Sequence, residues 1–157
     1  MALVAILVDV QNIYYTTRDA YGRAFNYRRF WQYMINQHEV VIANAYAIAS
    51  ANDGQHKFQQ ALKHIGFEVK LKPYIQRQDG SAKGDWDVGI TIDAIEASAK
   101  VDKVILLSGD GDFDCLMHHL RDNKGITTQV FSVATLTAAS LIASVDEYQP
   151  IGPDLLL

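Results

Sequence analysis

The stretch Leu106-Leu107-Ser108-Gly109-Asp110-Gly111-Asp112-Phe113 decides how this chain folds. Residues 103–108 form an apolar run typical of a strand buried on both faces, and Ser108-Gly109 interrupts it before a helical pattern begins near residue 112. Two carboxylates therefore follow the C-terminal end of a buried strand, which is where α/β proteins place their chemistry. Two acids at one strand end suit a hard divalent cation, because such ions prefer oxygen ligands.

The first apolar run, residues 3–9, ends in the same way, at Asp9-Val10-Gln11-Asn12. If these two strands are neighbours, Asp9 converges with the two later acids. Further strands are expected over residues 40–49, 67–72, 126–131 and, as a short last strand, 144–148. Helical patterns lie between them, at residues 27–37, 54–65, 86–99, 112–123 and 135–142. This alternation predicts an α/β protein with a mainly parallel sheet of five to six strands, covered on both faces by helices.

The length of 157 residues fits one domain, which we place at residues 1–149, followed by a C-terminal tail at 150–157. The three leucines that end the tail pack either on the domain or on a second copy in a homodimer. The N-terminal apolar run is too short to span a membrane and lacks the features of a signal peptide, so we expect a cytoplasmic protein without a membrane partner.

Charge and cysteine content narrow the function. The net charge of −4 argues against binding nucleic acid through an overall positive potential, but it is compatible with a nuclease that carries clustered acids. The single cysteine, Cys115, excludes an internal disulfide and a cysteine-based zinc site, and we expect it to be buried.

A third acidic segment, Lys83-Gly84-Asp85-Trp86-Asp87-Val88, opens the helix expected from residue 86. Asp85 or its neighbour is a natural helix cap. Asp93 lies about 120° around the helix from Asp87. It stands among isoleucines, so it is either partly buried and hydrogen-bonded or a solvated edge residue. The polar stretch from Pro73 to Gly84 is expected to be a loop.

In order and approximate spacing, three motifs resemble the NYN domain family, a branch of the PIN-like nucleases, and its LabA-like bacterial members in particular. The motifs are Val8-Asp9-Val10-Gln11-Asn12, Lys83-Gly84-Asp85-Trp86-Asp87-Val88 and Ser108-Gly109-Asp110-Gly111-Asp112-Phe113. The resemblance implies a three-layer α/β/α PIN-like (Rossmannoid) fold and a ribonuclease that hydrolyses RNA to leave a 5′-phosphate. It also implies one or two Mg²⁺ or Mn²⁺ ions, held by Asp9, Asp87, Asp110 and Asp112.

The same resemblance implies supporting residues around these acids. Asn12 would orient a ligand or a carboxylate without adding charge, and Ser108 would act similarly. Asp93 matches a frequent acid in the central helix of the family. Lys83 would contact phosphate if its loop folds over the acids.

The residues that follow the first motif are candidates for substrate contact. Tyr14, Tyr15 and Arg18 come directly after Asp9 and Asn12, and aromatic and arginine side chains can stack on single-stranded bases. RNA is therefore the expected partner. No nucleotide cofactor is expected, because the chain has neither a GxGxxG fingerprint nor a P-loop.

Other functions fit the acids less well. The start of a calcium loop at Asp110–Asp114 fails, because Cys115 replaces the glycine and Arg121 replaces the bidentate glutamate that such a loop needs. A Toprim-like enzyme usually has a glutamate after its first strand, and a haloacid-dehalogenase-type phosphatase has Asp-x-Asp, whereas this chain has Asp9-Val10-Gln11. A catalytically weak or inactive NYN module that binds RNA or a protein partner is the main alternative.

Overall fold

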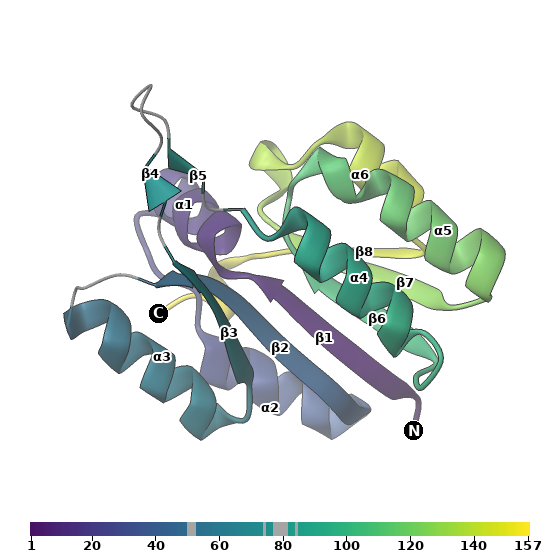
Figure 1. The fold of residues 1–157 in the computed structure, drawn as a ribbon, viewed down its shortest axis with the longest axis horizontal. Helices are drawn as coiled ribbons and strands as arrows, with labels where there is room; N and C mark the ends of the chain where they lie inside the picture. The colour runs from purple at the N-terminus through teal and green to yellow at the C-terminus, as the bar shows by residue number, and fades with distance from the viewer. Residues whose placement is uncertain (50–52, 74, 77–81, 84) are drawn as a thin grey trace.

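A six-stranded sheet forms the centre of the computed structural model, which describes residues 1–49, 53–73, 75–76, 82–83 and 85–157 (Figure 1). Its strands are β1 (Leu3–Asp9), β2 (Glu39–Ala49), β3 (Glu68–Pro73), β6 (Lys103–Leu107), β7 (Thr127–Ser132) and β8 (Glu147–Pro150). They lie in the order β3-β2-β1-β6-β7-β8, and every neighbouring pair is parallel. The predicted parallel sheet is confirmed, with six strands.

Three helices cover each face of this sheet (Figure 1). One layer holds α1 (Val10–Tyr21), α2 (Tyr27–Gln37) and α3 (Asp53–Ile65), and the other holds α4 (Asp87–Ala97), α5 (Asp114–Lys124) and α6 (Ala139–Ser144). Successive side chains of a strand point to opposite faces, so Val4, Ile6 and Val8 join the core on the α1–α3 side, while Ala5 and Leu7 join the other. The three-layer prediction is confirmed. None of the described helices is long and apolar enough to cross a membrane.

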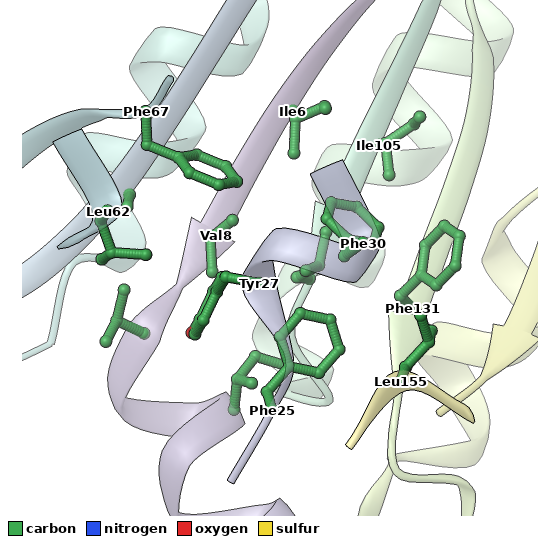
Figure 2. Packing of buried hydrophobic residues seen from close by; sticks show 14 of the residues in the cluster. Ile6, Val8, Phe25, Tyr27, Phe30, Leu62, Phe67, Ile105, Phe131 and Leu155 are labelled. Atoms are coloured by element: carbon green, nitrogen blue, oxygen red, sulfur yellow. The ribbon is translucent and has the colours of Figure 1, made fainter. Parts of the chain in front are cut away.

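Aromatic rings fill the core on the α1–α3 side (Figure 2). The ring of Phe30 meets that of Phe131 edge to face at 5.2 Å, and Tyr27 meets Phe67 at 6.1 Å. Such pairs add about 0.5–1.5 kcal/mol each beyond the area they bury. Val8, the residue before Asp9 in the sequence, packs into this cluster. The core therefore fixes the position of the C-terminal end of β1.

The helix α1 was missed by the sequence analysis. It buries Val10, Ile13 and Thr17 at a helical spacing, but it follows β1 directly, with no glycine or proline to mark where the strand ends and the helix begins. Its ends carry ordinary signals: the Asp9 side chain caps the N-terminus, and Gly22 ends the helix with a φ of 63°, which favours glycine.

Three further expectations change in the structure. The stretch 73–84 contains a short antiparallel pair, β4 (Ile75–Gln76) with β5 (Ala82–Lys83), and residues 77–81 between these strands lie outside the described residues. Short 3-10 helices also occur: η1 (Gly111–Phe113) precedes α5, η2 (Ala134–Leu136) precedes α6, and η3 (Pro153–Leu155) lies in the tail. Cys115 is exposed, because Leu116, Met117 and Leu120 take the core positions of α5.

The C-terminal segment packs on the domain itself. Ile151, Leu155 and Leu156 are buried in the aromatic core, and Leu156 forms a β-bridge with Phe25 (Figure 2 shows Leu155 beside Phe131). The tail thus covers the core where α1 passes into α2, while Leu157 is exposed.

Candidate metal centre

The sheet reverses its winding direction between β1 and β6. From β1 the chain runs through α1 and α2 to β2, and from β6 it runs through α5, on the opposite face, to β7. Parallel α/β sheets form their functional crevice at such a switch point, beyond the C-terminal ends of the strands. Asp9 is the last residue of β1, and Ser108 directly follows β6.

Three carboxylates from three different elements meet at this crevice. Asp9, Asp87 and Asp110 each offer an oxygen atom, and these atoms all lie within 4.8 Å of one another. Asp9 ends β1, Asp87 begins α4, and Asp110 caps η1 after β6. The structure therefore brings together three of the four acids that the sequence motifs singled out.

Hydrogen bonds from Ser108 and Asn12 hold Asp9 in place. Ser108 Oγ donates to Asp9 Oδ2 at 3.0 Å, and the backbone N–H of Asn12 donates to Asp9 Oδ1 at 3.4 Å. The backbone N–H of Asp110 donates in turn to Ser108 Oγ at 3.2 Å. The Ser108 hydroxyl thus links Asp9, the last residue of β1, to the backbone of Asp110 in the loop after β6.

Asn12 holds the loop that carries Asp110. Its Oδ1 accepts the backbone N–H of Gly109 at 2.9 Å. A Cβ at Gly109 would lie 3.0 Å from Thr137 Oγ1 and 3.1 Å from Leu136 O, so the loop packs tightly on its other side as well. Asn12 and Ser108 therefore both position the acids, through hydrogen bonds that add no charge.

Asp87 is placed by the first turn of α4. Its backbone N–H donates to Asp85 Oδ1 at 3.3 Å, and the indole N–H of Trp86 donates to Ala47 O on β2 at 2.9 Å. The N-cap of α4 is Trp86, which makes no side-chain capping bond, so Asp85 lies one residue before the cap, where its side chain accepts the Asp87 N–H. Asp85 also lines the acidic pocket, a role that the sequence analysis did not assign. Its place two residues before Asp87 is the only signal that could have suggested it.

Asp93 lies outside the cluster and anchors α4 to the sheet. Its Oδ2 accepts the Tyr46 hydroxyl at 2.7 Å and Lys70 Nζ at 2.9 Å, from β2 and β3. Burial favours the neutral acid, but the hydrogen bonds from Lys70 and Tyr46 prevail and hold the pKa of Asp93 below its ordinary value. Of the two environments considered for Asp93, the structure has the partly buried, hydrogen-bonded one.

The remaining candidates lie around the cluster. Asp112 is exposed and outside the group of three, and its backbone N–H donates to Asp110 Oδ1 at 2.9 Å. Tyr14 and Tyr15 are about half exposed on α1, with the Arg18 guanidinium 5.2 and 5.1 Å from their ring centres. The backbone of Lys83 belongs to β5, and its side chain is outside the described part of the chain.

The cluster carries uncompensated negative charge. Burial, more than repulsion from Asp110, raises the pKa of Asp9 to about 6, and burial together with the neighbouring Asp110 raises that of Asp87 to about 7. The pocket has a volume of about 240 Å³ and contains no basic side chain among its described lining residues, which are Asp9, Gln11, Asn12, Tyr15, Thr16, Asp85, Asp87 and Asp110. A hard divalent cation fits this donor set, because carboxylate oxygens are its preferred ligands and its charge would offset theirs.

A doubly wound parallel sheet with an acidic cluster at its switch point defines this molecule as a PIN-like α/β protein. The chain belongs to the NYN domain family, whose model matches residues 3–152. The family resemblance read from the three motifs is thereby confirmed.

Two comparisons agree with this assignment. The chain is 30% identical over 153 residues to the low amplitude and bright protein LabA of Synechococcus elongatus, covering 92% of this chain and 81% of that protein. It is also similar to the crystal structure of a protein of unknown function from Vibrio parahaemolyticus, with a TM-score of 0.95 and 52% identity over 99% of this chain and 96% of the other. The first supports a LabA-like NYN protein, and the second supports the fold.

Proposed function

We propose that this protein is a metal-dependent ribonuclease that hydrolyses RNA phosphodiester bonds at the acidic cluster. The observation that carries the proposal is the convergence of Asp9, Asp87 and Asp110 within 4.8 Å at the switch point of the sheet. The NYN domain is a branch of the PIN-like nucleases, and its model matches nearly the whole chain.

In this proposal Asp9, Asp87 and Asp110 would hold Mg²⁺ or Mn²⁺, and Asp112 would contribute directly or through water. The ion would neutralise charge on the scissile phosphate and lower the pKa of the attacking water. Asn12 and Ser108 keep the carboxylates in position before substrate arrives, which limits reorganisation during the reaction.

Substrate contact in this proposal comes from the exposed face of α1. Tyr14 and Tyr15 offer rings on which bases can stack, and Arg18 supplies positive charge beside an otherwise acidic pocket. Lys83, a further candidate for phosphate contact, stays a prediction.

Cleavage of labelled single-stranded and structured RNAs in Mn²⁺, Mg²⁺ or EDTA tests the proposal. Asp110→Asn keeps the size of the side chain but removes one metal ligand, so we expect cleavage to fall about a hundredfold or more. Asp122→Asn, which removes an exposed acid in the last turn of α5, the helix end away from Asp110, is the matched control and should cleave normally.

Two results would contradict the proposal. One is cleavage that persists in EDTA or in the folded Asp110→Asn protein. The other is the absence of both metal-dependent cleavage and measurable Mn²⁺ binding, which would favour a module that binds RNA or a protein partner without hydrolysis.

A further inference from the structure

A second hollow lies directly beside the acidic pocket. It has a volume of about 680 Å³, within the range of small-molecule sites. Helix α1, the end of β2 and the start of α3 supply its walls. It shares two lining residues, Gln11 and Tyr15, with the acidic pocket, so the two spaces adjoin at the N-terminal turn of α1.

The hollow exists because β2 is longer than β1. Asp9, where β1 ends, pairs with Tyr46, so the last three residues of β2, Ala47–Ala49, continue without a partner on the β1 side. Two of the three are alanines, and Ala24 lines the hollow from the other side. Small side chains at these positions leave space that larger residues would fill.

The lining selects a neutral, flat ligand with hydrogen-bonding edges. None of the described lining residues carries a charge, and three of them are aromatic: Tyr14, Tyr15 and Phe58. Gln11 and Gln55 add two carboxamides, each with both donors and an acceptor. Aromatic faces with a few convergent amides are suited to bind a nucleobase by stacking and by hydrogen bonds to its edge.

The described lining of the hollow is uncharged, whereas the adjoining acidic pocket is negatively charged. On the far side of Tyr15 lie the acids that, with a bound cation, would hold a phosphate, and Arg18 places a positive charge over the Tyr14 and Tyr15 rings. A ligand that fits both spaces has a neutral planar group joined to an anionic group. A nucleotide within an RNA strand has this chemistry.

We infer that the hollow binds the nucleobase next to the phosphate held at the acidic cluster. This inference rests on the proposed ribonuclease function and specifies its substrate as single-stranded RNA, because the base must leave its stack and its pair to enter the hollow.

Steady-state cleavage of a five-nucleotide RNA tests the site. Ala49→Trp fills the hollow, and Gln55→Ala removes one of its amides from an exposed position of α3. Each change should raise KM while kcat stays within about twofold, with a rise of about tenfold for Ala49→Trp. Ala20→Trp and Gln60→Ala are matched exposed controls outside the hollow and should behave as wild type. If Ala49→Trp does not fold, as judged by thermal melting, Gln55→Ala still provides the test.

An abasic RNA identifies what occupies the hollow. An abasic nucleotide next to the scissile bond should raise KM for wild type as much as Ala49→Trp does, and it should add nothing further in the variant. If the increases in KM caused by the abasic RNA and by Ala49→Trp multiply when the two are combined, the inference is wrong. It is also wrong if neither the abasic RNA nor Ala49→Trp changes KM.

Binding of free nucleosides separates this inference from the proposed function. The four nucleosides are titrated in EDTA and followed by calorimetry, so the metal site takes no part. Nucleosides that bind to wild type but not to Ala49→Trp support the base site. If the same wild-type protein cleaves no RNA, only the proposed nuclease function is rejected. Normal RNA cleavage with no nucleoside binding and no effect of Ala49→Trp would reject only the base site.

Discussion

Replacing Asp9 with Asn should make the metal-free protein more stable at neutral and alkaline pH. The pKa of Asp9 is raised in the folded protein to about 6 from its ordinary value of 3.8, mainly by burial. The folded state therefore binds this proton more tightly than the unfolded state. Above pH 6 the charged carboxylate opposes folding, and this penalty disappears as the pH falls towards 3.8 and the acid becomes protonated in both states.

The raised pKa gives the size of the effect. A difference of about 2.2 pKa units at 1.36 kcal/mol each corresponds to about 3 kcal/mol at pH 8, decreasing to about 1 kcal/mol at pH 4.5. Asparagine keeps an oxygen that can accept the Asn12 N–H at the start of α1 and an amide that can donate to Ser108 Oγ. The removed charge should therefore dominate the change in stability.

Urea denaturation in EDTA at pH 8, 6 and 4.5 measures this effect, with Asp19→Asn, an exposed acid of α1, as the control for charge. Adding Mn²⁺ should reverse the order: at a thousand times its Kd the ion stabilises wild type by about 4.1 kcal/mol, more than the penalty of about 3 kcal/mol, but leaves Asp9→Asn nearly unchanged. If Asp9→Asn destabilises the metal-free protein at pH 8, or shifts stability equally at all three pH values, the reasoning from burial is wrong.

Two further predictions concern the competition between protons and Mn²⁺ and the anchoring of α4 to the sheet. Mn²⁺ affinity measured by calorimetry should fall about tenfold per pH unit between pH 7 and 6, because the pKa of Asp87 is raised to about 7, and more steeply below pH 6, where Asp9 also takes up a proton; constant affinity from pH 8 to 5.5 would contradict this. Asp93→Ala should lower the free energy of unfolding by about 1–3 kcal/mol, since the Tyr46 hydroxyl and Lys70 lose their acceptor, while Mn²⁺ affinity stays within about threefold; a tenfold loss of affinity would place Asp93 at the metal instead.

Local hydrophobic patterns in the sequence were sufficient to predict the three layers of the fold. Buried strands and amphipathic helices are visible locally as apolar runs and 3.6-residue periodicity. Four of the six helices were expected within two residues of their observed bounds, whereas the helix expected at 135–142 divides into η2 and α6, which is Ala139–Ser144. Helix α1 was not expected, because it follows β1 directly with no glycine or proline between them, although its cap at Asp9 is visible in the sequence. Cys115 was predicted to be buried but is exposed, because its neighbours on α5, and not its own polarity, decide which face of the helix packs on the core.

By itself, the sequence determined the alternation of strands and helices, the acids at the ends of two strands, and the family to which the three motifs belong. Only the tertiary structure decided which acids meet. Asp112 is two residues from Asp110 yet stays outside the cluster, whereas Asp87 joins it from a separate element and Asp93, on the same helix, binds Lys70 and Tyr46. The physical reason is that strand order, register and helix placement bring distant residues together, and these depend on packing across the whole sheet. The hollow beside the cluster has the same origin, because it exists only where β2 continues beyond the end of β1.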